Sequence, residues 1–333
     1  MTAPIKVLSV IGCTRSGSTL LDNLLGSLDG FFSTGELRYI WERGLIEGRA
    51  CGCGRPVSEC DVWSRVLRVG FGSERPDHSL ITEIIRWQRD LVRTRHTHRI
   101  LRGGPSNHRS TSLNAYTAVA SKLYHAIAEV TQARVIVDSS KRPSDGAVTT
   151  LLPGIEPYFV HLVRDPRAVA FSWGKHKQEL DHPDETATAM PRHGVLSTCV
   201  DWMTLNLTSE LVVRRNQSRS LSLRYEDLVE RPRDVLAAIR RLVGEGTAPD
   251  SFIDEKTAIL ERNHTVSGNP DRFFSGRITV RNDERWMREQ SAGQRLAVEG
   301  LTLPLMRRYG YLGRKRSRPK APSKQVISVG GRD

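Results

Sequence analysis

The stretch "VIGCTRSGSTLL", Val10 to Leu21, decides how the rest of the chain is interpreted. An apolar run leads into Gly12, and a second glycine, Gly17, is followed by the hydroxyl residue Thr19. This spacing is typical of a loop that cradles a phosphate between a strand and a helix. Ser18, however, stands where a triphosphate-binding loop has its lysine.

Arg15 lies between the two glycines and supplies the positive charge that Ser18 lacks. A guanidinium can grip an anionic group with two hydrogen bonds. Backbone N–H groups at the start of a helix can hold a 5′-phosphate. The stretch therefore predicts a site for a phosphate that bears something other than a γ-phosphoryl group. Its expected ligands are Arg15, Ser16, Gly17, Ser18 and Thr19.

Short apolar runs rich in β-branched residues predict four buried parallel strands, at 6–12, 134–138, 158–163 and 220–225. Helical patterns separate them, at 19–28, 112–131, 166–177 and 231–243. This alternation predicts an α/β fold: a P-loop-like, doubly wound parallel sheet flanked by helices. In such a fold the ligand binds at the carboxyl ends of the strands.

The chain is expected to form a single domain over residues 1–312, with a helical insertion at about 36–112, after the first βα unit. Within the insertion, residues 79–96 have the apolar spacing of a helix, and its basic face is interpreted as solvated. A polar, proline-interrupted segment at 177–194 is predicted to be a mobile loop. Residues 313–333 form a basic tail that is predicted to be flexible.

The composition is basic: 50 Lys and Arg residues stand against 37 Asp and Glu residues among 333, a formal charge of +13. This excess favours an anionic ligand, nucleic acid or a membrane surface, without choosing among them.

No apolar stretch approaches the roughly 20 residues of a membrane helix, so a cytoplasmic location is expected. Five cysteines, an odd number, fit a reducing compartment better than a disulfide framework.

Three of the cysteines, Cys51, Cys53 and Cys60, lie within "CGCGRPVSEC". Thiols this close in sequence can hold a metal, but the spacing lacks a second Cys-x-x-Cys half or an obvious histidine partner. We therefore assign no metal site. The sequence favours buried or loosely paired thiols and leaves a zinc site as the alternative.

A second motif, "HLVRDPRAVAFSW" at 161–173, follows the third predicted strand. Arg164 leaves the strand end, and Pro166 occupies a favoured first-turn position of the next helix. Ser172 on that helix is placed to bind the same phosphate as Arg164. In the alternative interpretation, Arg164 pairs with Asp165 and Ser172 faces water.

Together these motifs resemble those of sulfotransferases that use 3′-phosphoadenosine 5′-phosphosulfate (PAPS). "TRSGSTLLDNLL" is similar to their 5′-phosphosulfate loop, in the arginine form of the tyrosylprotein and related bacterial branch, and "HLVRDPRAVAFSW" is similar to their 3′-phosphate motif. The resemblance spans roughly residues 6–311. It implies PAPS as co-substrate and no metal requirement.

Two later segments extend the resemblance. "RYEDLV" at 224–229 is similar to the strand-end element whose tyrosine, here Tyr225, shapes the nucleotide pocket; packing is its alternative role. The segment 264–286 looks like the loop that folds over the nucleotide. Its expected contacts are Ser267, Gly268, Asn269 and Arg277.

Sulfuryl transfer proceeds in line, so it requires charge stabilisation and a base. Arg15 and Lys141 are the expected stabilisers, although Lys141 can instead pair with Asp138 or Asp145. Glu36 corresponds to the glutamate base of the tyrosylprotein enzymes, and its alternative role is a helix cap.

Cytosolic members of the family use a histidine base after the second strand, where this chain has Ser139 and Ser140. This departure favours Glu36. His161 and His264 are kept as alternatives.

Two other functions fit parts of the sequence. A P-loop small-molecule kinase would share the sheet and the loop but needs a cation at Ser18. A non-enzymatic protein that binds nucleic acid or anionic lipid would use the basic surfaces, yet no nucleic-acid-binding motif supports it, and nucleic acid is not expected as a partner.

The acceptor is predicted to be a hydroxyl or amine on a carbohydrate, glycolipid or small metabolite. Peripheral membrane contact and the oligomeric state stay open.

Overall fold

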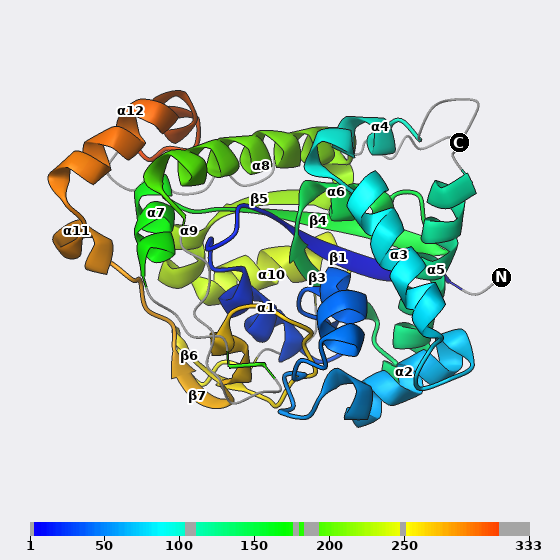
Figure 1. The fold of residues 1–333 in the computed structure, drawn as a ribbon. Helices are drawn as coiled ribbons and strands as arrows, with labels where there is room; N and C mark the ends of the chain where they lie inside the picture. Colours follow the sequence, from blue (N-terminus) through cyan, green and yellow to red (C-terminus); the bar gives the residue numbers. More distant parts are fainter. Residues whose placement is uncertain (1–2, 104–110, 176–179, 183–192, 247–250, 313–333) are drawn as a thin grey trace, which may run out of the picture.

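A computed structural model describes residues 3–103, 111–175, 180–182, 193–246 and 251–312 (Figure 1). The predicted flexible tail, 313–333, lies outside the described residues. Most of the predicted mobile loop at 177–194 also lies outside them.

The centre of the fold is a five-stranded parallel sheet with the order β2-β3-β1-β4-β5. Its strands are β1 (Ile5–Gly12), β2 (Phe31–Ser33), β3 (Val135–Lys141), β4 (Ile155–Val163) and β5 (Ser220–Arg224). The predicted α/β class and parallel sheet are confirmed, and the four predicted strands are all present. The sequence missed β2, whose three residues are too few to show a periodic pattern.

The apolar run of β1 is buried because helices cover both faces of the sheet. Val7 and Ile11 belong to one hydrophobic core, and Leu8 and Val10 belong to another. Successive side chains of a strand point to opposite faces, so one short run supplies both cores. The sheet is therefore doubly wound, as predicted.

The helices divide between these two faces (Figure 1). One core includes residues of α1 (Ser18–Gly26), α9 (Tyr225–Glu230) and α10 (Pro232–Leu242). The other includes residues of α5 (Thr111–Thr131), α6 (Pro143–Thr149) and α8 (Val195–Arg215). At the carboxyl end of β4, α7 (Pro166–Gly174) packs against α8, α11 (Arg285–Glu289) and α12 (Ala292–Arg308).

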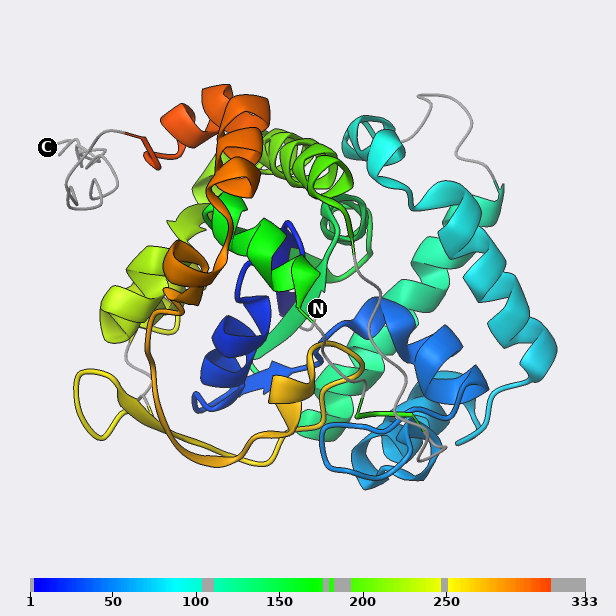
Figure 2. The same ribbon diagram turned by 60° about the vertical axis from the view of Figure 1, so that its left-hand side comes forward.

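The predicted helical insertion is present, and it begins after β2. It comprises short 3₁₀ turns at Leu37–Tyr39 and Val57–Glu59, a π-helix at Ile40–Ile46 and the helices α2 (Asp61–Phe71), α3 (His78–Leu91) and α4 (Thr97–Leu101). Figures 1 and 2 show α2 and α3 beside α5 at one end of the sheet. The predicted helix at 79–96 is shorter than expected, because α3 ends at Leu91 and only a separate short turn, Thr94–His96, follows.

A small antiparallel hairpin stands apart from the main sheet. It pairs β6 (Thr257–Leu260) with β7 (Gly276–Thr279), and the sequence analysis did not predict it. The segment between the two strands, drawn in gold in Figure 2, passes between α1 and the insertion. This path brings residues 264–268 beside the end of β2, because Val266 forms isolated bridges with Gly35 and Cys51.

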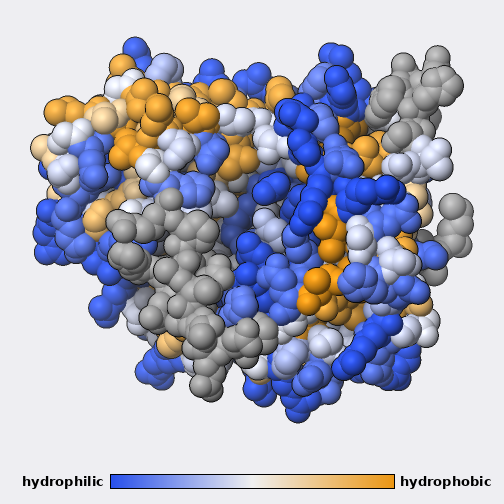
Figure 3. All heavy atoms as spheres, in the orientation of Figure 1, coloured by the Kyte–Doolittle hydropathy of each residue, from blue (hydrophilic) through white to orange (hydrophobic). Residues whose placement is uncertain are grey.

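The surface carries an apolar area over α8 and α12 (Figure 3). Its exposed side chains are Leu196, Val200, Leu207 and Leu211 of α8 and Leu296, Leu301 and Leu303 of α12. Within the described ranges, no helix combines the length and the apolar character needed to cross a bilayer.

Candidate active site

A cleft of about 780 Å³ opens at the carboxyl ends of β1, β3 and β4. Most of the residues predicted for the site line it: Arg15, Gly17, Ser18, Thr19, Glu36, Lys141, Arg164, Ser172, Tyr225, Gly268 and Asn269. Three others do not. Ser16 and Ser267 are buried, and Arg277 lies exposed on β7.

The loop between β1 and α1 requires glycine at both of its glycine positions. Gly12 has φ of +142°, and a Cβ there would lie 2.4 Å from the Leu162 carbonyl oxygen. Gly17 has φ of +87°, and a Cβ there would lie 2.2 Å from the ring of Tyr225. The loop can pass this close to β4 and to Tyr225 only without side chains at those positions.

The loop also contains strained and unsatisfied groups. Arg15 has φ of +65°, in the left-handed region that non-glycine residues seldom adopt. The buried Ser16 hydroxyl has no hydrogen-bond partner among the described residues. Buried polar groups are normally paired, so a loop with such a group is suited to an anionic ligand.

Two arginines converge on this loop. The Arg164 Nη1 donates to the Arg15 carbonyl oxygen at 3.1 Å, and its guanidinium lies 4.4 Å from the centre of the Tyr225 ring. The Arg15 guanidinium lies 4.9 Å from the centre of the Trp173 ring. Burial lowers the pKa of Arg15, although Glu36 opposes the shift. Two aromatic faces thus orient two cations at one end of the cleft.

Local contacts fix Arg164 in this position. Asp165 caps α7 through the backbone N–H of Arg167 at 2.9 Å and also binds the Arg167 guanidinium. The Trp202 Nε1 donates to the Arg164 carbonyl oxygen at 2.9 Å. The Asp165 carboxylate is therefore engaged by Arg167, and Arg164, between β4 and α7, lines the cleft together with Ser172 of α7.

Lys141 and Glu36 also line the cleft, and they form an ion pair in which the lysine Nζ donates to Glu36 Oε1. Both side chains are largely buried, at 12% and 13% exposure. Lys141 ends β3 with φ of +70° and pairs with Ile11 after a bulge, which places it next to the loop between β1 and α1. The structure thus joins two residues that are 105 positions apart in sequence.

The backbone around Glu36 is held by the segment that follows β6. The Glu36 N–H donates to the Val266 carbonyl oxygen at 2.8 Å, and the Val266 N–H donates to Thr34 at 2.8 Å. A Cβ at Gly268 would lie 3.2 Å from Glu36 Oε1, so this glycine allows the carboxylate to approach closely. Glu36 is therefore positioned by tertiary contacts as well as by its own turn.

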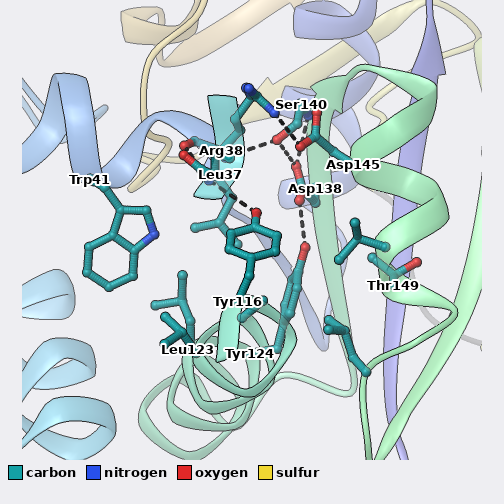
Figure 4. A pocket seen from close by; sticks show the side chains of 15 residues that line it. Leu37, Arg38, Trp41, Tyr116, Leu123, Tyr124, Asp138, Ser140, Asp145 and Thr149 are labelled. Atoms are coloured by element: carbon teal, nitrogen blue, oxygen red, sulfur yellow. Dashed lines mark hydrogen bonds and ion pairs between the residues drawn. The ribbon is translucent and has the colours of Figure 1, made fainter. Parts of the chain in front are cut away.

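A buried polar network includes Asp138 and Ser140, which precede Lys141 in β3 (Figure 4). The Ser140 hydroxyl donates to Asp138 at 2.6 Å, as does the hydroxyl of Tyr124. Arg38 donates from its backbone N–H to the Ser140 hydroxyl and from its guanidinium to Asp145 at 2.7 Å. Burial raises the pKa of Asp138. These bonds use the two aspartates that Lys141 was expected to bind in its alternative role.

The structure adds residues that sequence reasoning missed. Arg43, Trp173, Asp283 and Arg285 line the cleft. A hydrogen bond from Arg285 and the charge of Arg164 hold the pKa of Asp283 at about 2, despite partial burial. Arg285 and Asp283 lie within segment 264–286, which the sequence already linked to the nucleotide. Their charged side chains could therefore have been predicted to line the site. Nothing in the sequence marked Arg43.

The two histidines kept as alternative bases lie elsewhere. His161 is buried in β4, where its Nε2 lies 3.0 Å from the Asn206 side-chain oxygen, and burial lowers its pKa. His264 lies 3.2 Å from the Cys60 sulfur through its Nδ1. Neither histidine lines the cleft as the described residues define it.

Comparisons with known proteins agree with this architecture. The profile of a family described as the sulfotransferase family matches residues 8–249. A search of curated proteins found no match. Among solved structures, the chain is similar to a sulfotransferase domain from the curacin biosynthetic pathway, with 15% identity, 91% of this chain and 98% of that chain covered, and a TM-score of 0.50. It is also similar to the sulfotransferase domain of the Synechococcus PCC 7002 olefin synthase, with 18% identity, coverage of 93% and 96%, and a TM-score of 0.47.

Proposed function

Because the chain belongs to the sulfotransferase family, we propose that it transfers the sulfuryl group of PAPS to a hydroxyl or amine acceptor, by in-line transfer. One observation carries the proposal. The Glu36–Lys141 ion pair and the Arg15–Arg164 contact line the same cleft beside a phosphate loop that has no lysine. This arrangement supplies a carboxylate and several cations, but the loop lacks the lysine with which a P-loop binds a triphosphate.

The loop would bind the 5′ end of the donor. Gly17 is the N-cap of α1, so the first backbone N–H groups of that helix are available to the phosphosulfate. The hydroxyl of Thr19, which lines the cleft, adds a polar contact, whereas the unpaired Ser16 hydroxyl is buried beneath the loop surface and does not line the cleft. Arg15 would neutralise negative charge at the sulfuryl end.

The 3′-phosphate would bind at the second strand-to-helix turn. Arg164 offers a charged donor there, and Ser172 lies on the helix that follows. Tyr225 packs against both the Arg164 guanidinium and Gly17, so it links the two phosphate sites. Ser267, Gly268 and Asn269 belong to the segment that we propose closes over the nucleotide. Arg277 is the least supported of the proposed contacts because it is exposed on β7.

In the transfer step, the bond between sulfur and the bridging phosphate oxygen breaks as a bond from sulfur to the acceptor oxygen or nitrogen forms. Glu36 takes the proton that the acceptor loses. Lys141 and Arg15 stabilise the negative charge that develops on the departing phosphate. For this, the Lys141 ammonium has to turn from Glu36 toward the bridging oxygen, which also frees the carboxylate to act as a base.

The acceptor is proposed to be a carbohydrate, a glycolipid or a small metabolite. The cleft continues past Glu36 to Tyr39 and Arg43, where the Arg43 guanidinium lies 4.2 Å from the centre of the Tyr39 ring. Such a pairing presents both an aromatic face and a cation. Both features suit a polar acceptor that is rich in oxygen.

The experiment that tests the nucleotide assignment is calorimetry with adenosine 3′,5′-bisphosphate. Charge-assisted hydrogen bonds contribute about 1.5–3 kcal/mol, so Arg164→Ala should weaken binding by roughly 10- to 100-fold. Arg86→Ala is the matched control, because Arg86 is exposed on α3 and pairs only with Glu83 among the contacts described here. Equal affinities for Arg164→Ala and wild type would overturn the assignment.

The same titration discriminates against a kinase. A P-loop kinase binds ATP with magnesium in preference to the bisphosphate. We expect this protein to bind the bisphosphate in preference to ATP with magnesium.

Incubation with ³⁵S-labelled PAPS and a cell extract, followed by mass spectrometry of the labelled product, then tests transfer and identifies the acceptor.

A further inference from the structure

Three cysteines and one histidine meet away from the cleft. The ligand atoms of Cys51, Cys53, Cys60 and His264 all lie within 4.8 Å of one another. Cys51 and Cys60 are fully buried, and Cys53 is 8% exposed. The His264 Nδ1 lies 3.2 Å from the sulfur of Cys60 and 3.9 Å from that of Cys51. His264 is thus the histidine partner that the sequence spacing lacked.

The backbone presents these side chains in a preformed way. Cys51 donates from its N–H to the Arg55 carbonyl oxygen at 2.7 Å and accepts from the Gly54 N–H at 2.8 Å, which closes a tight turn around Cys53. Gly54 has φ of +88°, a conformation that suits glycine. Cys60 is the N-cap residue of α2. A turn and a helix start therefore hold the three thiols before any ligand binds.

Several donors in the cluster stabilise thiolate sulfur. The backbone N–H groups of Trp63 and Cys53 donate to the sulfur atoms of Cys60 and Cys51, respectively. Thiolates with N–H donors are the form in which cysteines bind metal.

Two arginines surround the cluster. Arg272, 2% exposed, donates to the carbonyl oxygens of Ala50 and Thr265, the residues adjacent to Cys51 and His264. Arg262 donates to the Cys53 carbonyl oxygen at 2.6 Å. Three thiolates and one neutral imidazole around a divalent cation carry a net charge of −1. Arg272 also pairs with Asp181 at 3.2 Å, so Arg262 is the guanidinium that can balance this charge.

We propose that Cys51, Cys53, Cys60 and His264 bind one Zn²⁺ ion as a tetrahedral structural site. Zinc–sulfur bonds of about 2.3 Å place tetrahedral ligands about 3.8 Å apart, within the spread of the four atoms seen here. Sulfur and imidazole ligands in a closed four-coordinate set favour zinc over magnesium or calcium. A disulfide would use only two of the four groups and would leave Cys53 and His264 unexplained.

The site joins segments that are remote in sequence. His264 lies two residues before Val266, which hydrogen-bonds to the backbone of both Thr34 and Glu36. The Trp63 Nε1 donates to the His264 carbonyl oxygen at 2.8 Å, a second link between α2 and this segment. The metal therefore fastens the insertion to the segment beside Glu36. In the part of the chain that the structure describes, none of the four ligands lines the cleft, so the ion is not expected to contact substrate.

Metal analysis of the purified full-length chain tests the proposal. Inductively coupled plasma mass spectrometry should find about one zinc per chain. Cys53→Ser and His264→Ala should lose most of that zinc, whereas Cys199→Ser should retain it. Cys199 is a matched control because it is a buried free cysteine on α8, away from the cluster.

A second measurement on the wild-type chain covers the case in which the variants fail to fold. Titration of the native protein with a mercurial reagent should release zinc in step with thiol modification, detected with a colorimetric chelator. Removal of the metal should also lower the thermal unfolding midpoint of wild type. A zinc-free wild-type protein that does not take up added Zn²⁺ would overturn the proposal. So would a Cys51–Cys60 disulfide, found as a mass lower by two hydrogens. Because none of these readouts depends on turnover, failure here is distinguishable from failure of the proposed sulfuryl transfer.

Discussion

The cleft has two parts that are built in different ways, the proposed phosphate side and the Glu36 side. On the phosphate side, the loop between β1 and α1 and the turn between β4 and α7 are each continuous in sequence, and Arg164 contacts Arg15 directly. On the Glu36 side, the ion pair to Lys141 and the backbone bonds to Val266 join three separate parts of the chain. The residues of the proposed phosphate site are thus close together in sequence, whereas the position of Glu36, the proposed base, depends on long-range contacts.

Both sides nevertheless contain strained backbone. Arg15 on the phosphate side has a positive φ, as do Lys141 and Ser267 on the Glu36 side. Each such residue costs on the order of 1–3 kcal/mol and persists where surrounding contacts fix it. This shared strain indicates that both sides are held in place by the fold.

The largest expected effect tests the Glu36 side alone. Glu36→Gln should lower turnover by about 10²-fold or more, because a general base contributes roughly 10²- to 10⁴-fold. Bisphosphate affinity should change by less than about twofold, since the phosphate side is intact. Initial rates with labelled PAPS and calorimetry measure the two quantities.

Glu42→Gln is the matched control, because Glu42 lies in the same part of the insertion and pairs with Arg89 at 2.5 Å. It should keep wild-type turnover. Unchanged turnover in Glu36→Gln would mean that another group is the base. It would contradict the proposal that one part of the cleft binds the donor while Glu36 removes the proton.

A smaller effect, on stability, is expected at a buried contact between α1 and β2. Asp22 of α1 is buried and accepts a hydrogen bond from Ser33 of β2. Burial raises the pKa of Asp22 from 3.8 to about 6, although hydrogen bonds from Ser33 and Ser139 oppose the shift. Between these pH values the native carboxyl keeps its proton and the unfolded one loses it, so stability falls as pH rises through this window. A shift of this size corresponds to about 3 kcal/mol.

Asp22→Asn removes the ionisable group while keeping an acceptor for Ser33. We expect its free energy of unfolding to exceed that of wild type at pH 8 and the gain to disappear below pH 4. Urea unfolding at several pH values measures this difference. Asp90→Asn on the exposed part of α3 should show no such pH dependence, and a gain of equal size at all pH values in Asp22→Asn would refute the burial explanation.

The smallest expected effect concerns Arg277. Sequence reasoning grouped it with the nucleotide contacts, but it is exposed on β7 and does not line the cleft. Arg277→Ala should change bisphosphate affinity by less than about twofold, as surface substitutions usually do. Arg285→Ala, at a residue that lines the cleft, should weaken binding more. A loss with Arg277→Ala as large as that with Arg164→Ala would show that the hairpin closes over the nucleotide in solution.

The sequence allowed most of the fold to be predicted because its signals are local. The apolar runs of β1, β3, β4 and β5 and the periodic helices α1, α5 and α10 were all predicted from residues within a few positions of one another. The strand β2 and the β6–β7 hairpin were missed, because strands of three or four residues carry too little pattern. Helix α8 was also missed, since its apolar residues are spread over both a buried and an exposed face.

For the site, the sequence by itself determined the glycine loop after β1 and the arginine turn after β4, because a glycine with positive φ or a helix start is specified by adjacent residues. Only the tertiary structure decided that Lys141 meets Glu36, that Val266 holds the Glu36 backbone and that His264 joins Cys51, Cys53 and Cys60. The physical reason is separation along the chain. Contacts between residues more than 100 positions apart form only when the packed core brings their elements together, and no local sequence pattern indicates which elements will meet.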